Sequence, residues 1–352
     1  VWNYNYNSAG NFQLAQLYVA QGDIPMALER LDEAIARNAD NFSALNLKAT
    51  ILRTQGDKAG ASACVKRVSE TDPVNAYAAY EQLLLGESDY FETLMRDEPE
   101  SYLELALAYL HNGFPETAVE LLERIDARTA YPTVKMWLGY LAGKAGDKAA
   151  EKKYFTAALA IPTDRCNPFR LETAAVLERA KELCPESYKP CYYLGNLYYN
   201  KQPDRAMAEW EQCIDKEPSF AMAWRNLGWA HWLHTKNYGE AVKYYRKAID
   251  LAPEEALFLE EIDQVYEAKG EDVQVRYDLL KSRHAVCTKR YSPLAGEVTA
   301  GIFVGDYDYV LKLLKECYFP TREGVANFHD VYVDALLLAG EEKFAAGQRK
   351  EA

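Results

Sequence analysis

The sequence lacks the features that mark membrane, secreted and nucleic-acid-binding proteins. No apolar run approaches the roughly 18 residues that a membrane-spanning helix needs. Residues 1–10 show no basic stretch followed by an apolar one, the pattern of a secretion signal. Positive charge is in deficit, since 40 Lys and Arg stand against 53 Asp and Glu, a formal net charge of −13. This excess of acid argues against binding to nucleic acid or to an anionic membrane by bulk electrostatics.

Cysteine pairs and flexible linkers are also missing. The seven cysteines are scattered, their number is odd, and no two have a C-x2-C spacing. We therefore expect buried thiols and a cytoplasmic protein, although Cys184 and Cys191 could pair in an oxidising compartment and a periplasmic location stays open. With 14 prolines and no Gly/Ser-rich tract, the chain has little room for a flexible linker between domains.

A repeating pattern of small and bulky residues is present instead. Two copies lie in residues 188–253. Their matching positions are Gly195, Ala206, Trp210, Cys213 and Pro218 in the first copy, and Gly228, Ala241, Tyr245, Ala248 and Pro253 in the second. From the alanine onward the spacings are four, three and five in both copies. Such spacings place side chains on one face of a helix, and the small residues let two successive helices approach closely.

The same kind of pattern extends along the chain, and near its start it has a period of 34 residues. It predicts complete helix pairs over residues 8–40, 41–74, 101–128, 133–162, 188–218 and 222–253. Residues 75–99, 163–187 and 254–352 are expected to form irregular units, with a last helix over 326–339 that ends at Gly340. All of these units are expected to belong to one domain, residues 1–352.

With Trp224, Leu227 and Gly228 at its start, the second copy resembles the tetratricopeptide repeat, which opens with Trp-x2-Leu-Gly and closes with proline. This resemblance implies an all-α fold, a right-handed superhelical solenoid of about ten helix pairs. Pairs stack in this way because a single pair cannot bury its apolar face alone. Trp224, Leu227 and Tyr245 are expected to fill the seam between the two helices of their pair.

The whole chain also resembles bacterial tetratricopeptide-repeat proteins that carry a β-rich domain ahead of the repeats. The resemblance rests on the strings VWNYNYN, NLKAT, ESYLELALAYL, CNPFRLE, YYLGNLYYN, WRNLGWA and FPTREG, in that order. It implies a fragment of a longer protein whose β-rich domain is similar to galactose mutarotase, and hence a carbohydrate-related role. The apolar start of the chain, with Trp2 in need of a neighbouring repeat, leads to the same expectation of a fragment.

No set of residues predicts catalysis. The sequence has no phosphate-binding glycine loop and no nucleophile–base signature, so we expect this chain alone to be no enzyme and to need no cofactor. Activity of a full-length protein stays open. His231 and His234 have a spacing that can share a metal, but His231 stands at a helical packing position, and no carboxylate or cysteine completes a site.

Two further patterns bear on ligands. Residues 254–278 hold nine acidic residues against Lys269 and Arg276, which indicates either a solvated helical face or a patch for basic or hydroxyl-rich ligands. Asn196 and Asn226 match the two asparagines with which some tetratricopeptide-repeat proteins grip a C-terminal carboxylate. Tyr192, Leu257 and Glu261 stand where the basic residues of that site belong, so a carboxylate ligand is not expected.

The first helices of successive pairs are expected to line a concave groove. The predicted groove residues are Tyr192, Asn196, Tyr199, Arg225, Trp229, Trp232, Glu260, Gln264 and Glu267. Aromatic rings beside hydrogen-bonding groups suit an extended peptide or a sugar, so the favoured function is a scaffold that binds a partner protein, a peptide or a neighbouring domain. The alternative is the non-catalytic part of a carbohydrate-active protein, with Trp229 and Trp232 packed against another domain. Self-association through exposed apolar ends is a further expectation.

Overall fold

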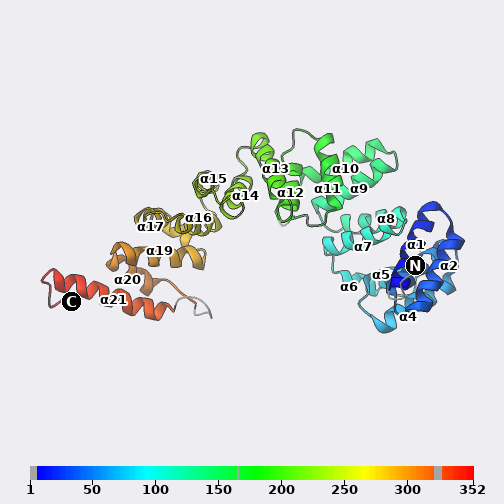
Figure 1. Cartoon of the computed structure of the whole chain (residues 1–352), viewed down its shortest axis with the longest axis horizontal. Helices are drawn as coiled ribbons and strands as arrows, with labels where there is room; N and C mark the ends of the chain where they lie inside the picture. The colour runs from blue at the N-terminus through cyan, green and yellow to red at the C-terminus, as the bar shows by residue number, and fades with distance from the viewer. Residues whose placement is uncertain (1–5, 165, 321–326) are drawn as a thin grey trace. The chain divides into compact units, whose positions relative to one another are not determined.

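The computed structural model describes residues 6–164, 166–320 and 327–352. Throughout these ranges the helix is the only regular secondary structure, which confirms the predicted all-α fold. The chain divides into two compact units, and Figure 1 labels most of their helices. The first unit comprises Val1–Cys166 and Glu182–Cys184, and the second comprises Asn167–Lys181 and Pro185–Ala352. That all repeats form one domain stays a prediction.

The first unit is built from helix pairs in which each odd-numbered helix packs against the next helix along the chain. Its helices are α1 (Asn7–Gln21), α2 (Ile24–Arg37), α3 (Phe42–Thr54), α4 (Lys58–Thr71), α5 (Ala76–Leu85), α6 (Tyr90–Met95), α7 (Pro99–His111), α8 (Pro115–Asp126), α9 (Pro132–Lys144) and α10 (Lys148–Ala160). The short α5 and α6 lie in residues 75–99, the first of the stretches expected to be irregular.

The second unit contains two regular pairs, α12 with α13 and α14 with α15, followed by less regular helices. Its helices are α11 (Thr173–Leu183, whose last residues cluster with the first unit), α12 (Lys189–Tyr198), α13 (Pro203–Lys216), α14 (Ala221–Leu233), α15 (Tyr238–Leu251), α16 (Ala256–Lys269), α17 (Val273–Ser282), α18 (His284–Cys287), α19 (Tyr291–Val304), α20 (Tyr307–Glu316) and α21 (Phe328–Ala345).

A Gly-Asp step makes the turn between paired helices. Gly22 has a φ of +78°, in the left-handed region that glycine adopts without steric cost. The next residue, Asp23, accepts a hydrogen bond from the Met26 backbone N–H (3.2 Å) and so caps α2. In the turn between α14 and α15 the left-handed position is held by Lys236, with a φ of +56°. There the side chain adds a steric cost that glycine avoids.

Glycines inside helices allow paired helices to pack face to face. A Cβ at Gly195 of α12 would lie 2.3 Å from Nε1 of Trp210 in α13. A Cβ at Gly228 of α14 would lie 2.8 Å from the Tyr245 ring in α15. Both distances are shorter than real Cβ contacts, so the small residues of the repeat pattern are a packing requirement at these positions.

The structure corrects two details of the sequence predictions. Leu227 and Tyr245 are fully buried in their seam, but Trp224 is only partly buried, and its indole N–H donates to the Pro218 carbonyl (2.9 Å). The last helix does not end at Gly340, because α21 continues to Ala345. A glycine inside a helix costs only about 1 kcal/mol, which the flanking helix-forming residues offset. Trp2 and residues 321–324 of the FPTREG string lie outside the described residues.

Candidate functional site

A connected set of polar side chains joins α12, α14 and α16, which follow one another as first helices in the second unit, and includes Trp210 of α13. The Trp210 indole N–H donates to Asn196 Oδ1 (3.2 Å), and Asn226 Nδ2 donates to the same oxygen (3.0 Å). Arg225 donates to Asn226 Oδ1 (3.1 Å) and, through Nε, to Glu261 Oε2 (2.7 Å). A second guanidinium nitrogen contacts Glu261 Oε1. We call these five residues the amide ladder.

The donors in the ladder fix the orientation of both amides. An indole N–H can only donate, so Asn196 must present its oxygen to Trp210. A guanidinium can also only donate, so Asn226 must present its oxygen to Arg225 and its NH2 group to Asn196. The NH2 group of Asn196 remains, and the described residues give it no hydrogen-bond acceptor. The NH2 group of Asn196 is therefore left to donate a hydrogen bond to an oxygen of a ligand.

The ladder carries no net charge at its centre. The side chains of Arg225 and Glu261 are 19% and 5% exposed, and each neutralises the other. Burial alone would lower the pKa of the Arg225 guanidinium, but the hydrogen bonds to Glu261 together with the negative charge of that carboxylate raise the pKa. Because Arg225 is already held on both sides, it is not free to grip a ligand carboxylate.

Three partly buried aromatic rings flank the ladder. The Arg225 guanidinium carbon lies 4.8 Å from the Trp229 ring centroid, and Trp232 meets Trp229 edge to face at 5.4 Å. Tyr199 lies 5.4 Å from Trp210. Burial raises the pKa of the Tyr199 phenol, against a smaller opposing effect of Trp229, so the phenol stays neutral at physiological pH. These rings offer flat apolar surface beside the free Asn196 donor.

The structure brings together some of the predicted groove residues and separates others from them. Those in the ladder or against it are Asn196, Tyr199, Arg225, Trp229 and Trp232. Tyr192 is instead buried, with its ring 4.9 Å from that of Phe220. Trp210, Asn226 and Glu261 join the ladder without being among the predicted groove residues. The signal that could have found Glu261 is an acid about one repeat after Arg225, on the next first helix.

Most acidic residues of the stretch 254–278 form ion pairs, some with bases inside the stretch and some with bases elsewhere in the second unit. Glu260 pairs with Arg290 (2.8 Å), and Asp263 pairs with Arg276 (2.8 Å). Gln264 and Glu267 are exposed on α16, and Glu267 lies 3.8 Å from the same Arg276. The stretch is therefore mostly paired and does not form one open field of negative charge.

The two candidate metal histidines have separate partners. The His231 ring stacks on Tyr244 at 5.1 Å, whereas His234 Nε2 lies 2.8 Å from Asp204 Oδ1. Burial lowers the pKa of His231. In residues 6–164, 166–320 and 327–352, no group of three or more His, Cys, Asp or Glu is placed to hold a metal ion. No helix in these ranges is both long and apolar enough to span a bilayer.

The thiols near the ladder are shielded from reaction. Cys191 and Cys213 are fully buried, and burial raises the pKa of both thiols. A raised pKa leaves little of the reactive thiolate at neutral pH. Among the described residues Cys191 forms no disulfide.

Comparison with known proteins identifies the repeats. Residues 12–76 and 196–256 match the sequence model of the tetratricopeptide repeat family. These two segments are tetratricopeptide repeats. The second segment contains Asn196, Arg225 and Asn226, so most of the amide ladder is carried by tetratricopeptide repeats.

Several solved structures are similar to this chain at low identity. Yeast Tom70 is 15% identical, with 97% of this chain and 91% of that chain covered and a TM-score of 0.36. MamA from Desulfovibrio magneticus RS-1 is 18% identical, with coverages of 53% and 94% and a TM-score of 0.32. YrrB, titled a TPR protein with an unusual peptide-binding site, is 19% identical, with coverages of 65% and 95% and a TM-score of 0.25. TM-scores of this size transfer no property to this chain.

Proposed function

We propose that this chain is a protein-interaction scaffold that binds an extended, uncharged segment of a partner protein at the ladder surface. We define the ladder surface as Asn196, Tyr199, Arg225, Trp229 and Trp232. The observation that supports this function most directly is the Asn196 NH2 group, which has no acceptor among the described residues and lies beside partly accessible aromatic rings. A backbone carbonyl of an extended peptide would supply that acceptor.

The chemistry of the surface favours an uncharged segment. The two tryptophan rings supply contact area at low cost in side-chain entropy. Arg225 is held by Glu261 before any ligand arrives, so little further ordering is needed on binding. Because that pair is neutral, a C-terminal carboxylate or an acidic segment would gain no attraction from it.

Asn196→Asp tests this function most sharply. The aspartate keeps the size of the side chain and an oxygen for Trp210 and Asn226, but it replaces the free donor with an acceptor. We expect peptides selected from a display library on the wild-type chain to bind this variant at least tenfold more weakly, which corresponds to about 1.4 kcal/mol. Asn200→Asp, an exposed site just beyond α12 with the same change of charge, is the matched control.

A second variant tests the rings. Trp229→Ala combined with Tyr199→Ala should lose the peptides while circular dichroism still shows a helical chain. Peptide binding that survives both this variant and Asn196→Asp would show that the partner binds elsewhere, and the ladder surface would then be rejected as the site.

The carbohydrate alternative uses the same groups. Hydroxyl oxygens of a sugar could accept from Asn196, and its apolar face could stack on Trp229. The resemblance to bacterial proteins with a mutarotase-like domain motivates this alternative, in which this chain is a non-catalytic part of a longer protein. Calorimetric titration with a panel of aldoses and glycosides separates the peptide and the sugar alternatives. A heat of sugar binding that the wild-type chain shows and Asn196→Asp lacks would favour the sugar alternative. Turnover of those compounds by the chain itself would contradict a non-enzymatic role.

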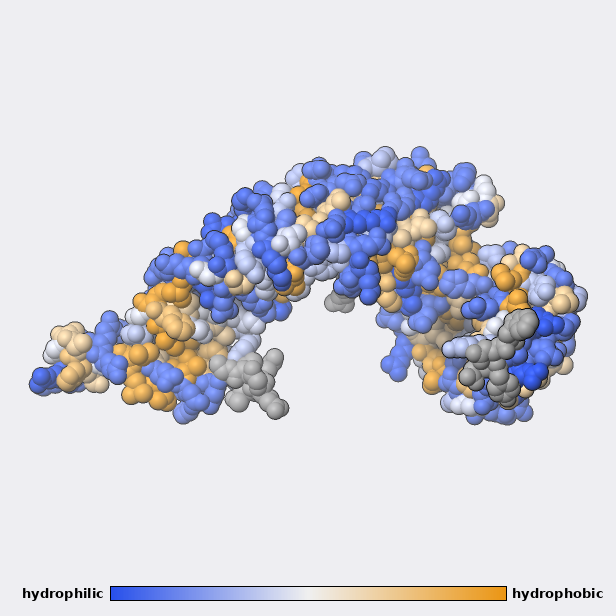
Figure 2. All heavy atoms as spheres, viewed as in Figure 1, coloured by the Kyte–Doolittle hydropathy of each residue, from blue (hydrophilic) through white to orange (hydrophobic). Residues whose placement is uncertain are grey.

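Self-association is a second candidate property, and it concerns the other end of the second unit. Apolar residues gather at the surface around α20 and α21, as Figure 2 shows. Leu337 and Phe344 of α21 are 62% and 60% exposed. Light scattering at rising protein concentration should report a mass above that of one chain, and Leu337→Glu should abolish the increase. A mass that stays at 39.9 kDa would contradict self-association.

We also propose a cytoplasmic location for this chain. Cys191 and Cys213 are buried thiols in the packed interior of the second unit, as expected for a protein that folds in a reducing compartment. Alkylation of the denatured protein, isolated under conditions that trap thiols, should label both residues. Recovery of either one as a disulfide would favour the periplasm.

A further inference from the structure

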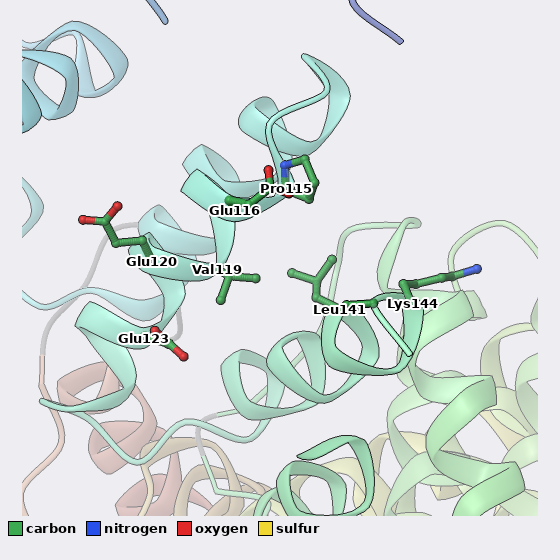
Figure 3. A pocket seen from close by; sticks show the side chains of 8 residues that line it. Pro115, Glu116, Val119, Glu120, Glu123, Leu141 and Lys144 are labelled. Carbon is green, nitrogen blue, oxygen red and sulfur yellow. The ribbon is translucent and has the colours of Figure 1, made fainter. Parts of the chain in front are cut away.

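A cleft of about 480 Å³ lies between α8 and α9, within the first unit. Val119 of α8 and Leu141 of α9 point toward each other across it, as Figure 3 shows. Pro115 and Ala145 extend this apolar lining at the ends of the two helices. Val119 and Leu141 are only partly buried, so the cleft presents apolar side chains to solvent. We call it the α8–α9 cleft.

One side of the cleft is acidic. Glu116, Glu120 and Glu123 of α8 line it at spacings of four and three residues, which place them along one side of the helix. All three are exposed, and none forms an ion pair with another described residue. The one base on α8, Arg124, is held by Glu92 (2.7 Å). No base of the described residues is therefore paired with these three carboxylates.

The other side of the cleft carries a single base. Lys144 lies at the end of α9, with Nζ 5.2 Å from the centre of the Tyr140 ring. The two sides thus differ in sign, with three negative charges on α8 and one positive charge on α9. This asymmetry favours a ligand with a basic edge that faces α8 and an edge with a negative charge that faces Lys144.

We propose that the α8–α9 cleft binds an amphipathic helix of a partner protein that has a basic edge beside an apolar stripe. The apolar stripe would pack on Val119 and Leu141, as helices do in other hydrophobic grooves. Lysines or arginines at spacings of four and three on the partner would face the three glutamates. From Pro115 to Glu123 the cleft spans about 12 Å, or roughly two helical turns, which matches that spacing.

This inference does not depend on the proposed function of the ladder surface. The cleft belongs to α8 and α9 of the first unit, and the ladder belongs to α12, α13, α14 and α16 of the second. It also takes the opposite kind of segment, since the ladder surface favours an extended uncharged peptide and the cleft a basic helix. A scaffold with both would hold two different segments.

A charge-swap experiment on the whole chain tests the cleft. The probe is a fluorescent synthetic helix with a leucine stripe, three lysines at spacings of four and three on one edge, and a single glutamate on the other. We expect binding in fluorescence anisotropy that weakens as salt increases, because the charges face solvent. The variant E116K/E120K/E123K should weaken binding at least tenfold. A probe with glutamate in place of its three lysines should bind that variant and not the wild-type chain.

Two controls make the outcome decisive. Glu70→Lys, Glu87→Lys and Glu211→Lys together make the same change of net charge on exposed residues away from the cleft, and should leave binding of the lysine probe nearly unchanged. Leu141→Ser should weaken binding of the lysine probe when it is made in the wild-type chain. It should likewise weaken binding of the glutamate probe when it is added to E116K/E120K/E123K. No binding of the lysine probe, equal loss in the control triple variant, or failure of the swapped pair to bind would each overturn the proposal.

Discussion

Arg225 of α14 and Glu261 of α16 form an ion pair through two guanidinium nitrogens, and both side chains are mostly buried. Removing one partner strands the other charge in the protein interior, which typically costs about 3–5 kcal/mol for a buried pair. We expect Arg225→Met to lower the free energy of unfolding of the second unit by an amount near the lower end of that range. The measurement is guanidinium titration followed by tryptophan fluorescence, because Trp210, Trp224, Trp229 and Trp232 all lie in the second unit.

The double variant Arg225→Met/Glu261→Leu provides the control for that prediction. Replacing a buried pair with apolar residues of similar size is often nearly neutral, so the double variant should lose less stability than Arg225→Met alone. If the loss of stability in the double variant instead equals the sum of the losses caused by Arg225→Met and by Glu261→Leu separately, the two side chains do not act as a pair.

The contact between Gly195 and Trp210 leads to a second prediction. A Cβ at Gly195 would lie 2.3 Å from Trp210 Nε1, so Gly195→Ala must displace the indole and break its hydrogen bond to Asn196. Overpacking of this kind typically costs about 1–3 kcal/mol. Gly239→Ala is the matched control, because its new Cβ would meet only Asn237 Oδ1 at an ordinary 3.6 Å. A thermal melt in which both variants behave alike would show that the seam tolerates a methyl group at Gly195.

The third prediction concerns Lys236, which holds the left-handed turn position that glycine holds after α1. Lys236→Gly should raise the free energy of unfolding by up to about 1 kcal/mol, since it removes the steric cost of a side chain at positive φ. Lys247→Gly, at an exposed helical position in α15, should instead cost about 1 kcal/mol. Chemical denaturation of both variants shows whether each change raises or lowers the free energy of unfolding. A lower free energy of unfolding in Lys236→Gly would refute the idea that the Lys236 side chain adds a steric cost.

Much of the fold could be predicted because it depends on residues close in sequence. The spacings after Ala206 and Ala241 define one face of each second helix, and the glycine–aromatic contacts of Gly195 and Gly228 follow from them. The end of α21 was predicted wrongly because that prediction relied on one local residue, Gly340. A glycine at position 340 weakens the helix but does not break it, and Gly347, which follows the helix, has the positive φ that Gly340 lacks.

The candidate site could be predicted only in part, because the pairing of its charged side chains depends on contacts between different helices. Asn196, Arg225 and Trp229 follow from positions on single helices. Whether Arg225 is available to a ligand depends on Glu261, which lies 36 residues later, and on the register in which α14 meets α16. Likewise, the excess of acid over 254–278 does not show that Arg290 neutralises Glu260 from the start of α19. Sequence composition records charges but not their partners.

The last prediction concerns pH and the region where α17 meets the turn before α20. Asp306 Oδ2 accepts hydrogen bonds from the Tyr277 hydroxyl (2.6 Å) and from Lys281 Nζ (2.5 Å). Burial alone would raise the pKa of Asp306, but these two hydrogen bonds together with the positive charge of Lys281 and a backbone hydrogen bond from Tyr309 hold the pKa below its usual value. A carboxyl group whose pKa is lower in the folded than in the unfolded chain stabilises the fold above its unfolded pKa of about 3.9. That stability is lost as the pH falls through the folded pKa.

Asp306→Asn should therefore lower the melting temperature at neutral pH, and its difference from wild type should shrink as the pH approaches about 3. Asp308→Asn is the matched control, because Asp308 is exposed and lies 3.8 Å from its nearest base, Lys343. Its melting temperature should follow that of the wild type across the whole range. If the curves of Asp306→Asn and wild type stay parallel from neutral to acid pH, the carboxylate of Asp306 does not stabilise the fold through its ionisation, and the contacts from Tyr277 and Lys281 act only as neutral hydrogen bonds would.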